Sequence, residues 1–176
     1  MQRALVMTVI GEDRPGLVQS VAAIVAEHGG NWLESRMSRL GGQFAGILRV
    51  EVSTDREASL LSALKQLESH GLTLVVQSDQ SAATQPNAQL SSLNIVGQDR
   101  PGIVRQISGT LARHGVNVEE LETECASAPM SGEALFKANA KLSIPANCDT
   151  EALREDLEKI AADLIVEISL ADLRQP

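Results

Sequence analysis

The sequence is organised around the hexapeptide Gly11-Glu12-Asp13-Arg14-Pro15-Gly16, which recurs 86 positions later as Gly97-Gln98-Asp99-Arg100-Pro101-Gly102. The similarity extends further, because His28-Gly29 and Asn31 recur without a gap as His114-Gly115 and Asn117. A repeat this long in a chain of 176 residues predicts two copies of one domain. We expect the first domain at residues 1–78 and the second at 90–176, joined by a polar linker at 79–89 without periodicity.

Each hexapeptide lies between a strand-like apolar segment and apolar residues at helical spacing, which predicts a strand-to-helix turn. We expect Asp13 and Asp99 to cap the two helices through their carboxylates, and Pro15 and Pro101 to occupy the first helical turns. The glycine that follows removes a side chain and leaves backbone amides exposed at the positive end of a helix. Such a turn suits a small carboxylate ligand; the alternative is a helix start with a purely structural role.

The remainder of each repeat predicts the element order βαββαβ. In the first repeat we expect strands at 4–10, 31–40, 44–52 and 72–77 and helices at 15–28 and 55–69. In the second we expect strands at 90–96, 117–126, 134–144 and 164–170 and helices at 101–114 and 149–162. Matching Phe136 to Phe44 raises the offset from 86 to 92, so we expect a longer, mobile hairpin loop around 127–132.

This order predicts an α+β fold of two tandem ferredoxin-like modules, each with a four-stranded antiparallel sheet and two helices on one sheet face. A module of only about 80 residues has a thin core. Pairing of the two modules, or of two chains in a homo-oligomer, would therefore add buried area.

The charge and composition limit the classes of partner. A net charge of −8, with only three aromatic residues, does not suit direct binding to nucleic acid. The acidity is concentrated in the second repeat, since residues 1–78 carry a net charge of −1 and residues 90–176 a net charge of −6. No apolar run is long enough to span a bilayer, and the start lacks the pattern of a secretory signal. We therefore expect a cytoplasmic protein without membrane contact.

The candidate catalytic and metal-binding side chains form no recognisable pattern. Cys125 and Cys148 do not have a metal-ligand spacing, and we expect both as reduced thiols. His28, His70 and His114 each precede a glycine, which predicts helix C-termini where the imidazoles contact the last carbonyls. The chain also lacks nucleophile-base and phosphate-loop motifs. We expect no catalytic activity, no metal and no cofactor.

The βαββαβ order, with Asp-Arg-Pro-Gly at the first turn and an asparagine opening the second strand, resembles the ACT domain, a regulatory module that commonly binds amino acids. Two such modules in one chain resemble the glycine cleavage system transcriptional repressor family. The resemblance implies an effector site near the first turn and the start of the second strand, often at a junction between modules. The matching positions are Asp13, Arg14, Gly16 and Asn31 in the first repeat, and Asp99, Arg100, Gly102 and Asn117 in the second.

The resemblance further implies a regulator that binds a small amino acid, with glycine as the first candidate, and contacts a DNA-binding transcriptional activator rather than DNA. The alternative is the detached regulatory subunit of an amino-acid metabolic enzyme. Glu120, Glu122 and Glu124 alternate on the second strand of the second repeat and so share one sheet face. They form either a docking surface for the partner or a solvated surface that keeps the chain soluble.

Overall fold

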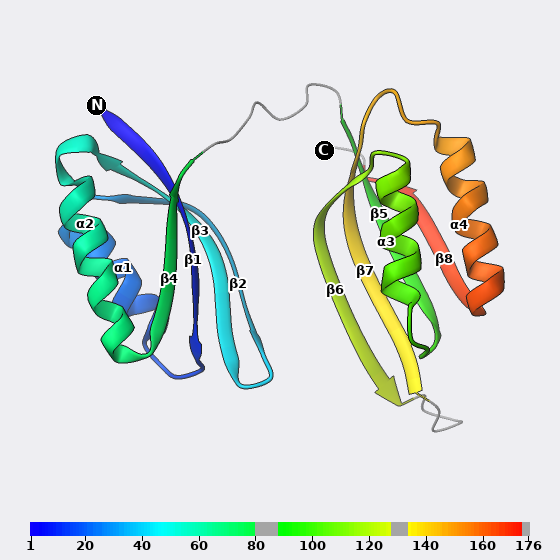
Figure 1. Ribbon diagram of the computed structural model, residues 1–176, viewed down its shortest axis with the longest axis horizontal. Helices are drawn as coiled ribbons and strands as arrows, with labels where there is room; N and C mark the ends of the chain where they lie inside the picture. Colours follow the sequence, from blue (N-terminus) through cyan, green and yellow to red (C-terminus); the bar gives the residue numbers. More distant parts are fainter. Residues whose placement is uncertain (80–87, 128–133, 174–176) are drawn as a thin grey trace. The chain divides into compact units, whose positions relative to one another are not determined.

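The computed structural model describes residues 1–79, 88–127 and 134–173, and the chain divides into two compact units, Met1–Ser81 and Ala82–Pro176 (Figure 1). The first unit contains β1 (Gln2–Glu12), α1 (Leu17–Glu27), β2 (Asn31–Leu40), β3 (Gln43–Ser53), α2 (Thr54–Gln66), the 3₁₀ helix η1 (Leu67–His70) and β4 (Leu72–Ser78). The second contains β5 (Gln89–Gln98), α3 (Ile103–Arg113), β6 (Asn117–Ser127), β7 (Ala134–Ile144), α4 (Thr150–Leu164) and β8 (Val166–Asp172).

The described strands form two antiparallel sheets with equivalent topology, in the orders β2-β3-β1-β4 and β6-β7-β5-β8. In each unit the two helices cover the same face of the sheet (Figure 1). Both the predicted ferredoxin-like fold class and the predicted duplication are therefore confirmed.

Alternation along the strands separates a buried sheet face from an exposed one. In β7 the side chains of Phe136, Ala138 and Ala140 are buried against the helices, whereas Lys137 and Lys141 between them lie on the opposite face. The helices contribute apolar residues at 3.6-residue spacing to the same layer. Examples are Leu60 and Leu64 in α2, Ile103 and Ile107 in α3, and Leu153 and Leu157 in α4. Each unit therefore has its own core between one sheet face and two helices.

The main error in the predicted boundaries concerns the helix starts. Helices were expected from residues 15 and 101, but α1 begins at Leu17 and α3 at Ile103. The reason is the preceding glycine, because Gly16 has φ 93° and Gly102 has φ 99°, a left-handed conformation that cannot continue into a right-handed helix. Each proline thus lies in the turn and not in the first helical turn.

The predicted linker, 79–89, falls mostly on residues 80–87, outside the described residues. At its start, Asp79 is attached to the first unit, because its N–H donates to the carbonyl of Ala4 at 3.0 Å and its carboxylate pairs with Arg49 at 2.6 Å. At its end, Gln89 already belongs to β5. The predicted longer hairpin loop falls mainly on residues 128–133, which also lie outside the described residues.

Two glycines of the second unit offer a paired test of packing. At Gly97 an added Cβ would lie 2.5 Å from Val166 Cγ1 and 2.7 Å from Val166 Cα, whereas at Gly109 in α3 it would meet nothing within 4 Å. We expect Gly97→Ala to lower the free energy of unfolding by about 1–3 kcal/mol through overpacking. Gly109→Ala should raise it by about 0.5–1 kcal/mol, because glycine is a poor helix former.

Urea unfolding followed by circular dichroism measures both effects. Trp32 is the single tryptophan and lies in the first unit, so its fluorescence transition should stay unchanged and serves as an internal control. Equal stabilities of the two variants would contradict the close approach of β5 and β8 at Gly97.

Candidate functional site

Both hexapeptides form strand-to-helix turns that are anchored to the neighbouring hairpin. The N–H of Asp13 donates to the carbonyl of Gly42 at 2.9 Å, and the N–H of Asp99 donates to the carbonyl of Ala134 at 2.9 Å. In both units, the equivalent hydrogen bond attaches the strand-to-helix turn to the hairpin between the second and third strands of that unit. The sequence prediction of a turn at this place is thus confirmed.

The predicted aspartate caps are wrong. Among the described residues, Gly16 and Gly102 are the N-cap residues of α1 and α3, and neither helix start has a side-chain cap. A true aspartate cap occurs at α4, where Asp149 Oδ1 accepts from the N–H groups of Glu151 and Ala152 at 3.1 and 3.0 Å. Since glycine has no side-chain oxygen, the first amides of α1 and α3 are left for water or a ligand.

The two turn aspartates have different partners. In the first unit Asp13 Oδ2 forms an ion pair with Arg39 Nε at 2.7 Å. The 86-residue offset aligns Arg39 with Cys125, which contacts Asp99 in the second unit. Loss of solvation raises the pKa of the Cys125 thiol, and the Asp99 carboxylate raises it further through its charge and a hydrogen bond. The thiol therefore stays neutral at neutral pH, so Asp99 faces a neutral group where Asp13 faces a cation.

The sequence analysis did not predict Arg39 or Cys125 as the partner of a turn aspartate, although the 86-residue offset places these two residues at equivalent positions. The predicted site residues lie in the hexapeptides and at Asn31 and Asn117, and they include no residue of the hairpin that lies beside the aspartate.

The two turn arginines also differ. Arg14 Nη2 donates to the backbone carbonyl of His70, at the end of η1. Arg100 Nη2 instead donates to Gln98 Oε1 at 3.3 Å, within its own hexapeptide. Arg14 thus connects its turn to the end of η1. Arg100 instead contacts a side chain of its own turn.

The asparagines lie far from the turn of their own unit. Asn31 opens β2 and is paired with Glu51, which is itself paired with Ala4 near the start of β1. The turn follows Glu12, eight residues farther along β1, which corresponds to about 26 Å of strand. Asn117 has the same place at the start of β6. The structure therefore does not bring the predicted turn residues and the predicted asparagine together within one unit.

An open depression of about 680 Å³ lies beside the turn of the second unit, between α3 and α4. Gly102 lies at one end of it, and Arg105 and Arg113 contribute positive charge. The aligned residues of the first unit are Gln19 and Glu27, which would not supply that charge. The surroundings of the second turn are therefore better suited to an anionic group.

The shared face of Glu120, Glu122 and Glu124 is confirmed by the strand register. These residues pair with Lys141, Asn139 and Lys137 on the sheet face that the helices do not cover. Two ion pairs cross the strands, from Glu124 to Lys137 at 3.2 Å and from Glu120 to Lys141 at 3.6 Å. The surface is consequently a ladder of mixed charge with an acidic outer strand.

The family assignment comes from comparison with known proteins. One ACT-domain family pattern matches residues 3–77 and a second matches residues 91–136. The chain is a tandem ACT-domain protein. The second match stops inside β7, whereas the second ACT domain continues through α4 and β8 in the structure.

Several relatives resemble the whole tandem ACT-domain chain. A glycine cleavage system transcriptional repressor from Escherichia coli (strain K12) is 24% identical over 164 residues, which cover 93% of this chain and 86% of that protein. The solved structure of an unknown protein from Galdieria sulphuraria has a TM-score of 0.86 and 28% identity, over 99% of this chain and 100% of that one.

A second solved structure, of a candidate glycine cleavage system transcriptional repressor, has a TM-score of 0.73 and 19% identity over 99% of both chains. At this identity the likeness shows the fold alone.

The histidines of the ACT domains lie at helix ends, as predicted. His28 Nδ1 contacts the carbonyl of Ile24 at 2.8 Å, and His70 Nδ1 contacts that of Gln66 at 3.3 Å. The ring of His114 departs from the prediction, because Nε2 contacts Asp156 Oδ2 at 3.1 Å. This contact, together with a hydrogen bond from Lys159, lowers the pKa of the Asp156 carboxyl.

In the described parts of the chain, no three His, Cys, Asp or Glu side chains are grouped so that they could hold a metal ion. Of the helices in these parts, none has the length and apolar character required to cross a bilayer.

The left-handed glycines predict a stability difference that depends on backbone conformation. At Gly102 an added Cβ meets nothing closer than Gln106 Nε2 at 4.0 Å, so strain at φ 99° dominates the effect of a substitution. We expect Gly102→Val to lower the free energy of unfolding of the second domain by about 1–2 kcal/mol. Gly102→Asn should cost less, because asparagine tolerates the left-handed region. Urea unfolding measures both, and equal losses would contradict this explanation.

Proposed function

We propose that this tandem ACT-domain protein is a non-enzymatic regulator that binds a small amino acid and controls transcription of the glycine cleavage system through a protein partner. The observation that carries the proposal is the pair of helix starts at Gly16 and Gly102, which have no side-chain cap and leave amides for a carboxylate. Similarity to the Escherichia coli repressor over 93% of the chain supports the regulatory assignment.

The proposed ligand contacts follow from the charges of an amino acid. The carboxylate would bind the amides at the helix start, and the ammonium group would bind an aspartate or asparagine oxygen. The turn and the asparagine lie at opposite ends of one domain, so a single bound amino acid would not contact both of them within that domain. The proposed residues are Asp13, Arg14, Gly16, Asn31, Asp99, Arg100, Gly102 and Asn117.

The two turns should not bind with equal affinity. Asp13 is already paired with Arg39, so part of its attraction for an ammonium group is lost. Asp99 contacts a neutral thiol, and Arg105 and Arg113 lie in the depression beside Gly102. Both differences favour binding of the amino acid at the turn of the second domain over binding at the turn of the first. A small amino acid such as glycine needs only these charged contacts, because it has no side chain to place.

The protein would act on transcription by binding a protein partner and not by binding DNA itself. A net charge of −8 opposes approach to DNA, and the acidic second domain would attract a basic surface of a DNA-binding activator. The glutamates at 120, 122 and 124 lie on its exposed sheet face. In the alternative role, as a detached regulatory subunit, the partner would be an amino-acid metabolic enzyme.

Calorimetry with each of the twenty amino acids tests the ligand. We expect binding of a small amino acid that Gly102→Asn weakens at least about tenfold, because the new side chain would crowd the amides facing the carboxylate. Gly16→Asn should have a smaller effect, since we assign the stronger site to the second domain. Ser108→Ala, in the same helix as Gly102 but outside both the turn and the lining of the depression, serves as the control. Unchanged affinity in Gly102→Asn would exclude the turn as the binding site.

A second experiment tests the route of the signal. Binding to the control region of the glycine cleavage genes is measured with the protein alone and with the candidate activator present. We expect binding only through the activator. Replacing Glu120, Glu122 and Glu124 by glutamine should slow association by up to about tenfold and flatten its salt dependence, with less effect on dissociation. Binding to the bare DNA at physiological ionic strength would refute the indirect route.

A further inference from the structure

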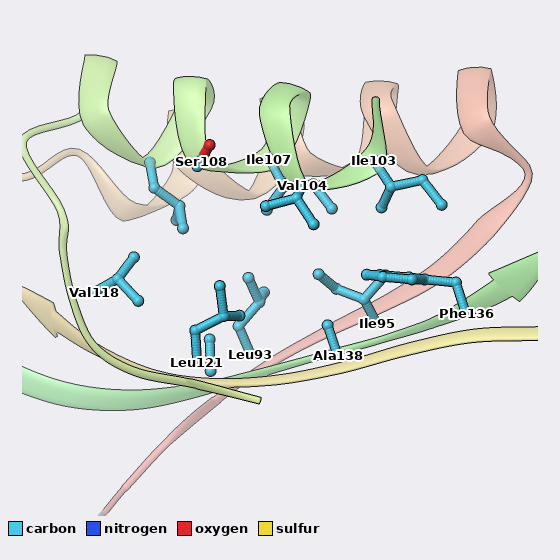
Figure 2. Close-up of a pocket in the computed structure, with 12 residues that line it drawn as sticks. Leu93, Ile95, Ile103, Val104, Ile107, Ser108, Val118, Leu121, Phe136 and Ala138 are labelled. Atoms are coloured by element: carbon cyan, nitrogen blue, oxygen red, sulfur yellow. The ribbon is translucent and has the colours of Figure 1, made fainter. Parts of the chain in front are cut away.

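The helix α3 has two faces of opposite character. Figure 2 shows the buried face, where Ile103 and Ile107 point toward the sheet. The other face borders the open depression of about 680 Å³ between α3 and α4. The lining of this depression combines two arginines with uncharged residues and includes no acidic side chain: Pro101, Gly102, Arg105, Gln106, Gly109, Thr110, Arg113 and Ile160. It is therefore a locally positive surface on an acidic domain, since residues 90–176 carry a net charge of −6.

A buried hydroxyl group holds Arg113 over this depression. Arg113 Nη2 donates to Thr110 Oγ1 at 2.9 Å, and Thr110 is only 1% exposed. The arginine side chain thus runs back toward the N-terminus of α3, which is the direction in which helical side chains tilt. A guanidinium has five N–H donors, so the bond to Thr110 leaves donors for an anion.

The floor of the depression is Gly109, which lies midway between the two arginines in the sequence. An added Cβ at Gly109 would meet nothing within 4 Å, so the space above this glycine is open. Thr110, which holds the Arg113 guanidinium, lies about 7.5 Å from Arg105 along the helix axis, at 1.5 Å per residue. Two linked anionic groups fit this separation better than a single group does.

The protein does not neutralise either arginine of the depression. Among the residues that the structure describes, neither Arg105 nor Arg113 forms an ion pair with a carboxylate. Asp156 of α4 is instead paired with His114 and Lys159, each at 3.1 Å. Both positive charges thus stay available to a ligand.

The first domain does not share this surface. Five positions of α1 align with residues of α3 in the depression, and all five differ from them: Gln19, Ser20, Ala23, Ile24 and Glu27. The buried positions of the two helices stay apolar, as at Val21 and Ile107. The replacements change the charge of this helix face from −1, at Glu27, to +2, and a glycine replaces the alanine at its centre.

We propose that the depression between α3 and α4 binds a ligand that carries a diphosphate group, with one phosphate on Arg113 and the other on Arg105. Arginine binds phosphate through two parallel N–H···O bonds, which favours it over lysine at such sites. The side-chain amide of Gln106 supplies a further donor, and Gly109 lets the ligand approach the helix closely. This site goes beyond the proposed function and does not rest on it.

Calorimetry with inorganic diphosphate, in magnesium-free buffer at physiological ionic strength, tests the site. We expect saturable binding with one site per chain, because the first domain lacks both arginines. Inorganic phosphate and succinate should each bind at least about tenfold more weakly, since each loses charge-assisted hydrogen bonds. Tighter binding of ADP than of inorganic diphosphate would identify a nucleotide as the source of the group, whereas equal binding would identify diphosphate itself.

Variants separate the depression from general electrostatic attraction. Arg105→Gln and Arg113→Gln should each lower diphosphate affinity at least about tenfold. Their matched control is Arg154→Gln, which removes the same charge from an exposed position of α4 outside the depression and should leave the affinity nearly unchanged. Gly109→Leu keeps both arginines but fills the space between them, so it should lower the affinity about tenfold. Its stability to urea should not fall, because glycine is a poor helix former.

Three results would overturn the proposal: binding of phosphate or succinate as tight as that of diphosphate, equal losses in Arg113→Gln and Arg154→Gln, or full affinity in Gly109→Leu. Asp99→Asn separates this site from the amino-acid turn, because it removes the proposed ammonium contact and should leave diphosphate affinity nearly unchanged. A loss in Asp99→Asn equal to that in Arg113→Gln would place the diphosphate at the turn and would also overturn the proposal. The amino-acid titrations contain no diphosphate, so the two proposals fail independently.

Discussion

A single layer of apolar side chains, held between two helices and the inner face of the sheet, stabilises each ACT domain. Its largest fully buried members include Met7 and Leu60 in the first domain and Leu142 and Leu153 in the second. Because a module of about 80 residues can build only one such layer, half of every strand must face away from it. The polar groups available for recognition therefore lie in the turns, on the outer faces of the helices and the sheet, and at the strand edges.

The turn between the first strand and the first helix shows how this constraint is used. A left-handed glycine, at Gly16 and again at Gly102, replaces the side-chain cap that Asp149 provides for α4. Glycine in place of a capping side chain destabilises a helix start by only a few tenths of a kcal/mol, so the arrangement has a small cost. Its presence in both copies is consistent with a role for the exposed amides.

The two domains share the same arrangement of helices and strands, and they differ in side chains at the surface. Arg39 is replaced by Cys125, which changes the charge beside the turn aspartate. Gln19 and Glu27 are replaced by Arg105 and Arg113, which line the open depression beside the second turn. The same backbone fold thus carries different surface chemistry in the two domains. In the second domain the turn aspartate has no cationic partner among the described ion pairs, and the edge strand β6 is acidic.

The sequence by itself determined the duplication, the order of the elements and the buried face of each strand, because these depend on local periodicity and on a repeat that can be read directly. It predicted the β7 strand at 134–144 without error. Its errors arose where the backbone conformation at one residue decides, as at Gly16, whose positive φ moved the helix start and removed Asp13 from the cap position.

Only the tertiary structure decided which distant residues meet. The pairing of Asp13 with Arg39, the contact of Asp99 with Cys125 and the separation of Asn31 from its own turn all depend on strand register. Local patterns carry no information about these contacts, because a shift of one residue in register would place every one of these side chains on the opposite sheet face.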